Sequence, residues 1–321
     1  MKAIVVREFG GPEVMKAEEV ETPAPNASQV LVKIESAGVN PVDTYIRSGI
    51  HAIRPDLPFT PGKDGAGTVA AVGEAVAKFA PGDRVFLTGT LTGTYAEYVL
   101  CNEDQLEILP DNVSFEAGAS VWIPYATAYR ALFQRGRAAN GEIVLIHGAS
   151  GAVGIAAIQW AKNAGLTVIG TASSAEGKQL ASENGADAVF DHTDEGHFAA
   201  IKEFTGGKGV DLVIEMLANE NLERDFEALA MYGRIIVVGN RGSLQFTPRL
   251  AMTKDADILG MTLFNAPPDK MAEIKTAIYD GLKQGFLKPV VGKTFPLAEA
   301  AAAHHAVIND KAFGKIVLIP G

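Results

Sequence analysis

The sequence contains a single cysteine, Cys101, among its 321 residues. No disulfide can form within the chain, which is typical of proteins in a reducing compartment, and we expect a cytoplasmic location. Long apolar runs are also missing, because the longest ones have the length of a strand and end at glycine or a charged residue. The opening segment MKAIVVREFGG is too short for a signal-peptide core and predicts a first strand. We therefore expect no membrane association.

Basic residues are fewer than acidic ones, 28 against 38, which gives a formal net charge of −10. A field of this sign disfavours nucleic acids and anionic membranes as main partners. No stretch interleaves basic and aromatic side chains in the way that RNA-binding surfaces do. We expect a small-molecule substrate and no nucleic acid.

Metal ligands are scarce. Catalytic zinc takes about three Cys, His or Glu ligands, and structural zinc usually takes four, mostly Cys. The chain has only Cys101 and six histidines, and the adjacent pair His304–His305 lies in an alanine-rich segment that predicts a helix. We predict that the protein holds no metal.

The pattern of the chain changes near residue 114. Before it, short β-branched segments alternate with Gly, Pro and Asn turns, which predicts a β-rich, partly barrel-like domain. After it, apolar strands alternate with helical patterns, which is typical of an α/β domain with a doubly wound parallel sheet. We predict a nucleotide-binding domain over residues 122–261 and a second domain from residues 1–121 and 262–321. Two of the expected helices cover residues 114–133 and 221–233.

A glycine-rich turn, HGASGAVG over residues 147–154, joins a predicted strand to a predicted helix. Its pattern Ala149-x-Gly151-x-x-Gly154 is the dinucleotide-binding fingerprint with Ala in place of the first Gly. Such a turn lets backbone N–H groups approach a pyrophosphate at the positive end of a helix. The alternative is a tight turn without a ligand, and the strand–helix repeats that follow favour the nucleotide site.

The end of the next strand indicates which nucleotide binds. An NAD site usually has Asp or Glu there, about 20 residues after the turn, to hold the ribose hydroxyls. Here the strand ends in Gly-Thr-Ala-Ser-Ser over residues 170–174, and the first acid is Glu176. Small hydroxyl side chains leave room for a 2′-phosphate, with Lys178 and His192 nearby to meet its charge. We predict NADPH, although one of the two serines is also expected to cap the following helix.

Several longer stretches resemble one family. They are GVNPVDTYIRSG, PGDRVF, YAEYVL, IPYATAYRAL, VLIHGASGAVG, DLVIEMLAN and GRIIVVGNRG. The chain is similar over nearly its whole length to the zeta-crystallin type of quinone oxidoreductase, in the zinc-free branch of the medium-chain dehydrogenases/reductases. Where the zinc enzymes of that superfamily have a ligand Cys, this chain has Asn40, and where they read Gly-His-Glu it reads Gly62-Lys63-Asp64.

The resemblance implies a Rossmann domain with a GroES-like domain, and an NADPH-dependent reduction of quinones by one- or two-electron transfer. It implies a catalytic cleft with Tyr45 and Asn40, and Thr127 near the nicotinamide carboxamide. The remaining residues that it implies at the cofactor are Ser150, Gly151, Ala152, Val153, Ser173, Lys178, His192, Asn221, Gly239, Asn240, Arg241, Met261, Thr262 and Leu263.

Other interpretations stay open at this point. Tyr45 taken alone would more often be a packing residue, Asn40 a turn residue, and His192 and Arg241 simple surface residues. An enone or alkenal double-bond reductase needs the same cofactor and an apolar cleft. A protein that binds NADPH with little turnover, like a lens crystallin, is a further alternative. We expect a homodimer, or a homotetramer, formed through edge strands such as those at residues 234–239 and 257–263.

Overall fold

The computed structural model describes residues 1–52, 54–311 and 313–321, which form two compact units. One unit comprises Met1–Ile123, Tyr279–Asp310 and Gly314–Gly321, and the other comprises Pro124–Ile278 and Lys311–Phe313. The sequence predicted a return to the first domain at residue 262, whereas the structural division follows Ile278. The beginning of helix α10 belongs to the second unit because Tyr129 and Gln134 hydrogen-bond to Glu273 and Lys270.

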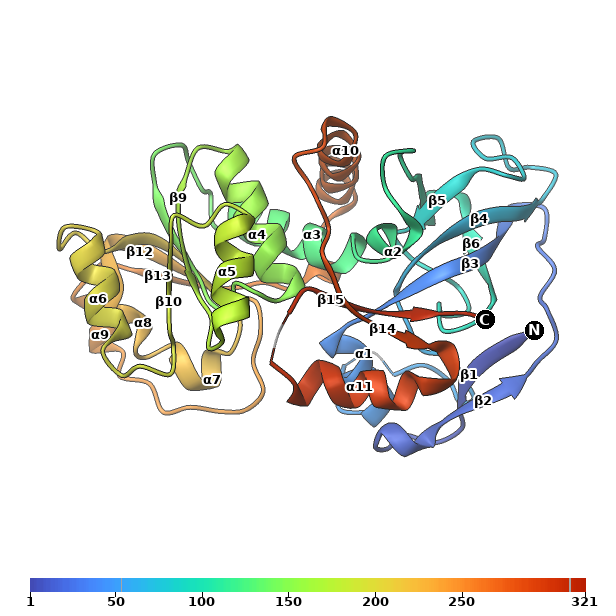
Figure 1. Ribbon diagram of the computed structural model, residues 1–321, viewed down its shortest axis with the longest axis horizontal. Coiled ribbons are helices and arrows are strands. Elements are labelled where there is room, and N and C mark those ends of the chain that lie inside the picture. The colour runs from blue at the N-terminus through green and yellow to red at the C-terminus, as the bar shows by residue number, and fades with distance from the viewer. Residues whose placement is uncertain (53, 312) are drawn as a thin grey trace. The chain divides into compact units, whose positions relative to one another are not determined.

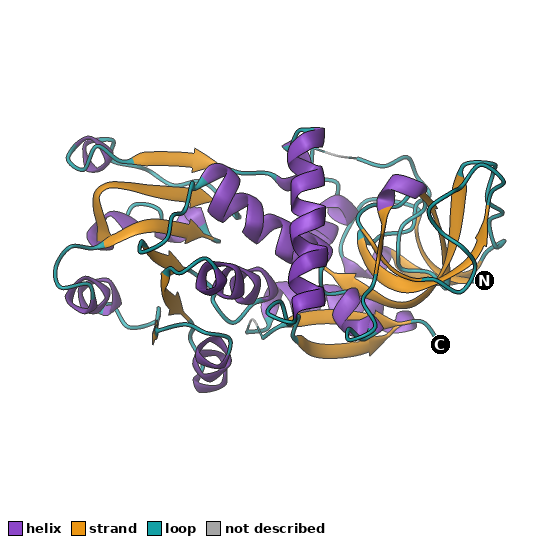
Figure 2. Cartoon of the chain, turned by 90° about the horizontal axis from the view of Figure 1, so that it is seen from above, coloured by secondary structure: helices purple, strands orange, loops and turns teal. Residues whose placement is uncertain are grey.

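The first unit is built on a seven-stranded sheet in the order β14-β15-β3-β4-β5-β7, with β6 paired to β3. A separate antiparallel pair joins β1 and β2. Figure 2 shows strands near the N-terminus curving around one another, in keeping with the expected partly barrel-like domain. The strands are β1 (Lys2–Val6), β2 (Met15–Glu19), β3 (Gln29–Val39), β4 (Asp64–Val72), β5 (Arg84–Leu87), β6 (Tyr98–Asn102), β7 (Leu106–Ile108), β14 (Val291–Pro296) and β15 (Lys315–Ile319).

Short helices connect these strands. Asn40 begins α1 through a capping box with Asp43, and Gly49 ends it in the left-handed conformation, with φ of 77°. The core of the unit is an apolar cluster from the inward faces of β1, β3 to β6 and β15. The helices are η1 (Pro12–Val14), α1 (Pro41–Ser48), η2 (Glu103–Gln105), α2 (Phe115–Gly118), the end of α10 (Pro268–Gln284), η5 (Leu297–Glu299) and α11 (Ala300–Asn309).

The second unit contains a six-stranded parallel sheet in the order β10-β9-β8-β11-β12-β13. Numbered from β8, this is the order 3-2-1-4-5-6 of the Rossmann fold. The strand order reverses between β8 and β11, because β9 and β10 are added on one side of β8 and β11 to β13 on the other. The predicted fold class is confirmed. The strands are β8 (Ile143–Ile146), β9 (Thr167–Thr171), β10 (Ala188–Phe190), β11 (Val210–Glu215), β12 (Leu229–Val237) and β13 (Asp257–Gly260).

Helices cover both faces of this sheet, with α4 and α5 on one side and α6, α8 and α9 on the other (Figure 1). Because both faces are covered, the central strands are almost wholly apolar, and Val144, Leu145 and Ile146 of β8 are completely buried. The helices are α3 (Trp122–Tyr129), η3 (Arg130–Arg135, π-helical), α4 (Ala152–Asn163), α5 (Ala175–Glu183), α6 (His197–Phe204), α7 (Ala218–Asn221), α8 (Asp225–Ala228), α9 (Arg249–Met252) and η4 (Leu263–Asn265).

The two long helices expected over residues 114–133 and 221–233 are wrong as single elements. The first is interrupted after Gly118, because the backbone N–H of Ile123 donates to the Asp64 carboxylate at 2.9 Å and Pro124 has no N–H to donate. The second ends at Ala228, where the chain enters β12 and Leu229 pairs with Val210 of β11. In both places a tertiary contact overrides a local helical pattern.

None of the helices among the described residues combines the length and the apolar character needed to cross a bilayer.

Candidate functional site

The predicted nucleotide turn lies at the carboxyl end of β8, where the strand order reverses. Gly148 has a positive φ of 58°, and Gly151 is the extended residue that precedes α4. No side chain caps this helix, so the first N–H groups of α4 are available to an anion. The turn thus brings Ser150, Gly151, Ala152 and Val153 together at a helix N-terminus, as the sequence predicted.

Close backbone packing makes glycine necessary just inside α4. A Cβ on Gly154 would lie 2.3 Å from the carbonyl oxygen of Gly148 and 2.7 Å from Cα of Ala149. The turn is also fastened to the neighbouring strand, since the N–H of Ala149 donates to the carbonyl of Thr171 at 2.9 Å. This narrow cradle of backbone donors fits a pyrophosphate.

The end of β9 has no acidic side chain. It runs into Ser173 and then Ser174, whose hydroxyl accepts from the N–H of Gly177 at 3.0 Å and caps α5. Lys178, one turn into that helix, pairs with Asp191 at 3.1 Å. Hydrogen bonds from Thr193 and Lys178 keep the pKa of Asp191 below its usual range. The donor set of Ser173, Lys178 and the neighbouring His192 fits a phosphate better than a bare ribose diol.

The ends of β11 and β12 bring the next predicted group to the same edge of the sheet. Asn221 in α7 donates to the Glu215 carboxylate at 3.2 Å. Gly239 bonds to the backbone of both Glu215 and Ala218, and a Cβ on it would lie 2.2 Å from the carbonyl oxygen of Met216. The following residues, Asn240 and Arg241, are exposed.

The remaining predicted residues of the second unit lie in or beside its other elements. Met261 follows β13, its N–H donates to the carbonyl of Val237 at 3.0 Å, and its side chain is buried. Thr262 is exposed and Leu263 is buried. Thr127 is a buried residue of α3. The role of each of these residues at the cofactor stays a prediction.

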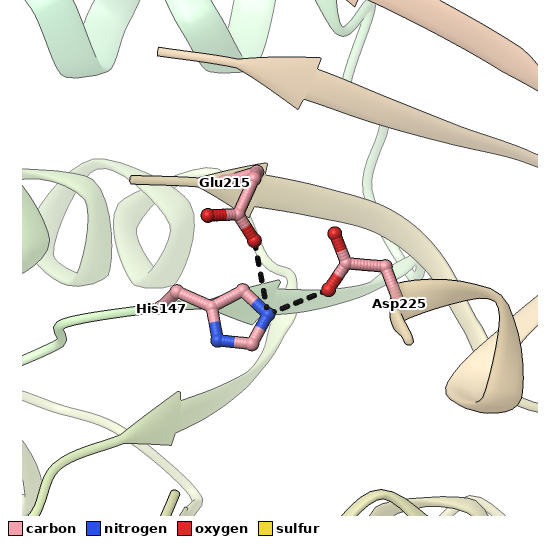
Figure 3. Close-up of side chains that lie close together, drawn as sticks. All are labelled: His147, Glu215 and Asp225. Atoms are coloured by element: carbon pink, nitrogen blue, oxygen red, sulfur yellow. Dashed lines mark hydrogen bonds and ion pairs between the residues drawn. The ribbon is translucent and has the colours of Figure 1, made fainter. Parts of the chain in front are cut away.

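Directly beneath the turn lies a polar cluster that the sequence analysis missed, formed by His147, Glu215 and Asp225 (Figure 3). His147 Nε2 lies 2.8 Å from Asp225 Oδ1 and 3.5 Å from Glu215 Oε2, and all three side chains are buried. Burial raises the pKa of Glu215 to about 7 and that of Asp225 to about 8, and it lowers the pKa of His147. The sequence did contain a sign of this cluster. His147 directly follows the apolar strand β8 and Glu215 ends the apolar strand β11, and these two strands are neighbours in a Rossmann sheet.

The first unit holds a second polar cluster, around Asn40. The Asn40 amide donates to Asp64 Oδ2 at 3.0 Å, and Asn40 Oδ1 accepts from the ammonium of Lys315. Lys315 also pairs with Asp64 at 2.6 Å, with side-chain exposures of 2% and 1%. Gly38 leaves room for this lysine, since a Cβ there would lie 2.8 Å from Lys315 Cε. A side-chain cation therefore bridges two positions at which the sequence departs from the zinc enzymes.

Helix α1 carries both predicted catalytic residues. Asn40 caps it and is 3% exposed, and Tyr45 is half-buried. Asp43 and Ile46, which lie elsewhere on α1, line a pocket of about 550 Å³ together with residues 58–63 and 90–93. Neither Asn40 nor Tyr45 is among the described residues that line this pocket. Their catalytic role stays a prediction.

Two family descriptions match the chain. The alcohol dehydrogenase GroES-like domain matches residues 26–111, and the zinc-binding dehydrogenase domain matches residues 152–278. A quinone oxidoreductase of Sus scrofa is 48% identical over 99% of this chain and 98% of its own length, and that of Homo sapiens is 46% identical over the same shares. The chain belongs to the quinone oxidoreductase family. The predicted family is thereby confirmed.

Solved structures of related proteins have the same fold. The Escherichia coli quinone oxidoreductase in complex with NADPH is 30% identical, covers 100% of both chains and has a TM-score of 0.90. An NAD-dependent alcohol dehydrogenase is also similar, with 33% identity over 100% of both chains and a TM-score of 0.92. Proteins described with either nucleotide thus share this architecture, so the choice of cofactor depends on the residues after β9.

Proposed function

We propose that this member of the quinone oxidoreductase family reduces quinones with NADPH. Full-length identity of 48% to a quinone oxidoreductase carries the proposal. The glycine cradle before α4 supports a dinucleotide, and the end of β9 without a carboxylate supports the choice of NADPH. A carboxylate there would repel a 2′-phosphate, whereas Ser173 and Lys178 would bind it.

In this proposal the turn and the strand ends hold the cofactor. Residues 150–153 would bind the pyrophosphate, and Ser173, Lys178 and His192 the adenosine 2′-phosphate. Asn221 and residues 239–241 would lie along the ribose and diphosphate, and Thr127 with residues 261–263 beside the nicotinamide. The Lys178 ammonium would exchange its contact with Asp191 for the phosphate, or share it between the two.

Quinone reduction requires little general acid catalysis from the protein. NADPH supplies the reducing equivalents from its nicotinamide ring when bound. Because quinones accept electrons readily, the protein contributes mainly by orienting the acceptor and excluding water. In this proposal Tyr45 on α1 would contact the acceptor or pass a proton to it. Asn40, held by Asp64 and Lys315, would form a fixed polar wall.

The direct test measures binding and turnover in sequence. Purified protein is titrated with NADPH and with NADH by fluorescence, and 9,10-phenanthrenequinone is then added while absorbance of the reduced nucleotide is followed. We expect tighter binding of NADPH, and oxidation that resists a metal chelator. A preference for NADH would contradict the interpretation of Ser173 and Ser174, and loss of activity with chelator would contradict the prediction of no metal.

A second candidate is the reduction of an activated double bond. A 2-haloacrylate reductase of Burkholderia sp is 30% identical over 99% of the chain. The same assay with an enone in place of the quinone separates the two candidates. Faster oxidation with the enone would favour this alternative, and tight NADPH binding without turnover on either acceptor would indicate a protein that mainly binds the cofactor.

The Tyr45→Phe variant tests the proposed mechanism. If orientation dominates, this variant keeps turnover within about tenfold of the original protein, less than the loss expected for a general acid. Loss of nearly all turnover at saturating quinone would show that Tyr45 is an essential acid.

We further propose a homodimer, or homotetramer, in the cytoplasm. Strand β13 is the edge of the six-stranded sheet, and Ile258 on it is 37% exposed, which supports pairing with a second copy. Light scattering coupled to gel filtration gives the mass of the assembly directly, and the mass of a monomer would contradict the proposed oligomer. The single buried Cys101 supports a reducing compartment, which cell fractionation tests.

A further inference from the structure

The buried cluster of His147, Glu215 and Asp225 occupies an unusual position in the second unit. His147 follows β8 directly, Glu215 is the last residue of β11, and Asp225 is the first residue of α8. β8 and β11 are the two strands between which the sheet order reverses, where Rossmann domains bind their ligands. Figure 3 shows both carboxyl groups converging on one imidazole nitrogen.

This cluster holds two acids with too few partners for both to be charged. Glu215 Oε2 and Asp225 Oδ2 have no hydrogen-bond partner among the described residues, and both side chains are 0% exposed. Two buried carboxylates beside one neutral imidazole would be strongly disfavoured, so the cluster retains protons at neutral pH. The upward shifts of the pKa values of both acids agree with this reasoning from the geometry.

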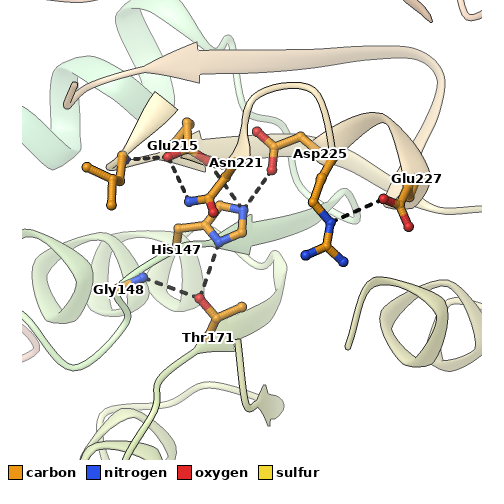
Figure 4. A network of polar contacts seen from close by, with 9 residues as sticks. His147, Gly148, Thr171, Glu215, Asn221, Asp225 and Glu227 are labelled. Carbon is orange, nitrogen blue, oxygen red and sulfur yellow. Dashed lines mark hydrogen bonds and ion pairs between the residues drawn. The ribbon is translucent and has the colours of Figure 1, made fainter. Parts of the chain in front are cut away.

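Hydrogen bonds connect the cluster to two segments that are predicted to bind the cofactor, the turn at Gly148 and helix α7 with Asn221 (Figure 4). His147 Nδ1 lies 3.3 Å from the hydroxyl of Thr171, and that oxygen accepts from the N–H of Gly148 at 3.4 Å. On the other side, Glu215 Oε1 accepts from the Asn221 side chain and from the N–H of Leu217. The turn at Gly148, through Thr171, and the predicted ribose contact Asn221, through Glu215, are thus connected to the same buried cluster.

One neutral form of the imidazole agrees with all of these bonds. With a proton on Nε2, His147 donates to Asp225, and its Nδ1 accepts from the Thr171 hydroxyl. The Thr171 oxygen is then free to accept from Gly148. Burial lowers the pKa of His147, so the imidazole carries only one proton at neutral pH. The further protons of the cluster therefore reside on the carboxyl groups.

We propose that His147, Glu215 and Asp225 are positioning residues of the NADPH site, and that the protons held by the two acids keep the affinity for NADPH high. The inference rests on the proposed function. As the pH rises and the cluster loses a proton, a buried negative charge forms beneath the phosphate-binding turn. That charge repels an anionic cofactor, so binding weakens.

Other titratable groups near the cluster do not account for the same effect. His192 and His197 face it from the end of β10 and from α6, and burial is the largest cause lowering the pKa of each, so both are neutral above neutral pH. Arg224 lies over the ring of Phe198 and pairs with Glu227. The second ionisation of the 2′-phosphate, near pH 6, is already about nine-tenths complete at pH 7. The range from about pH 7 to about pH 9 therefore isolates the two acids.

The experiment measures the dissociation constant of NADPH across this range at constant ionic strength. We expect the constant of the original protein to rise about three- to tenfold between about pH 7 and about pH 9. Glu215→Gln and Asp225→Asn remove one acid each without changing shape and should flatten the curve. Thr171→Val breaks the link to Gly148 and should weaken binding by a similar factor at every pH. Glu227→Gln, an exposed neighbour of Asp225 on α8, is the matched control and should follow the original curve.

Two binding results would each overturn the inference: a dissociation constant that does not change with pH in the original protein, or an unchanged pH dependence in both Glu215→Gln and Asp225→Asn. A measurement on the protein without cofactor separates the failure of this inference from the failure of the proposed function. The infrared band of a protonated carboxylic acid should be present near neutral pH and weaken in Asp225→Asn. If the band is present but NADPH does not bind at any pH, the proposed function is wrong while the protonated cluster stands. If the band is missing, the inference itself is wrong.

Discussion

Replacement of Lys315 by methionine should destabilise the first unit strongly. The ammonium of Lys315 pairs with Asp64 at 2.6 Å and bonds to Asn40, and the two charged side chains are 2% and 1% exposed. Methionine keeps most of the volume and the unbranched shape of lysine. The substitution therefore removes the charge while leaving the packing against Gly38 nearly unchanged.

The size of the effect follows from the carboxylate that is left behind. Asp64 would keep its bonds from the N–H of Ile123 and the amide of Asn40. It would lose the one partner of opposite charge that it has among the described residues. Removing one member of a buried ion pair costs about 3–5 kcal/mol. For a unit of this size each kcal/mol lowers the melting temperature by about 2–4 °C, so we expect a fall of about 6–20 °C.

Calorimetry or urea unfolding of four variants tests this reasoning. Lys293→Met is the matched control, because Lys293 pairs with Asp310 at the surface, with exposures of 49% and 42%, and should cost less than about 1 kcal/mol. Asp64→Asn alone should also be costly, and the double variant Lys315→Met/Asp64→Asn should recover part of the loss because no buried charge remains. A loss for Lys315→Met no larger than for Lys293→Met, or no recovery in the double variant, would refute the reasoning.

Three further predictions concern single residues. Gly154→Ala should abolish NADPH binding, measured by fluorescence, because its Cβ would lie 2.3 Å from a backbone oxygen of the turn. Burial raises the pKa of Cys101 to about 12, so a thiol reagent should label it only after unfolding, and rapid labelling of the folded protein would contradict this. Burial also raises the pKa of Asp43 to about 6. Its contribution to stability is therefore present below about pH 4 and is lost as the pH rises through about 6, and Asp43→Asn should flatten the change in the urea midpoint over that range, whereas an unchanged slope would place the proton elsewhere.

Local patterns predicted the second unit well. The alternation of apolar strands and helices indicated a parallel sheet, and the glycine turn after β8 fell where the strand order reverses. Each of these features depends on residues within about 30 positions of one another, the span of a βαβ unit. The serine cap of α5 was predicted for the same reason, since Ser174 and Gly177 are three residues apart.

The buried clusters could not be predicted in this way. Lys315 is separated from Asp64 by 251 residues and from Asn40 by 275, and no periodicity connects a lysine near the C-terminus with an asparagine on β3–α1. His147 and Asp225 are 78 residues apart. The broken helix over residues 114–133 has the same cause, because Asp64, which accepts from Ile123, lies 59 residues earlier in the sequence.

Some of the buried carboxyl groups lower the stability of the folded protein. Among the described residues, three buried carboxylate oxygens lack a hydrogen-bond partner, one each on Asp43, Glu215 and Asp225. An unpartnered buried group of this kind costs free energy that an apolar residue would not. Asp43 bonds to the backbone of Asn40, and the two others flank the imidazole that precedes Gly148. The costly groups thus lie next to the residue predicted at the acceptor and next to the turn predicted at the cofactor. A fold selected only for stability would have no reason to place them there, which is why we regard them as part of the predicted functional site in each unit.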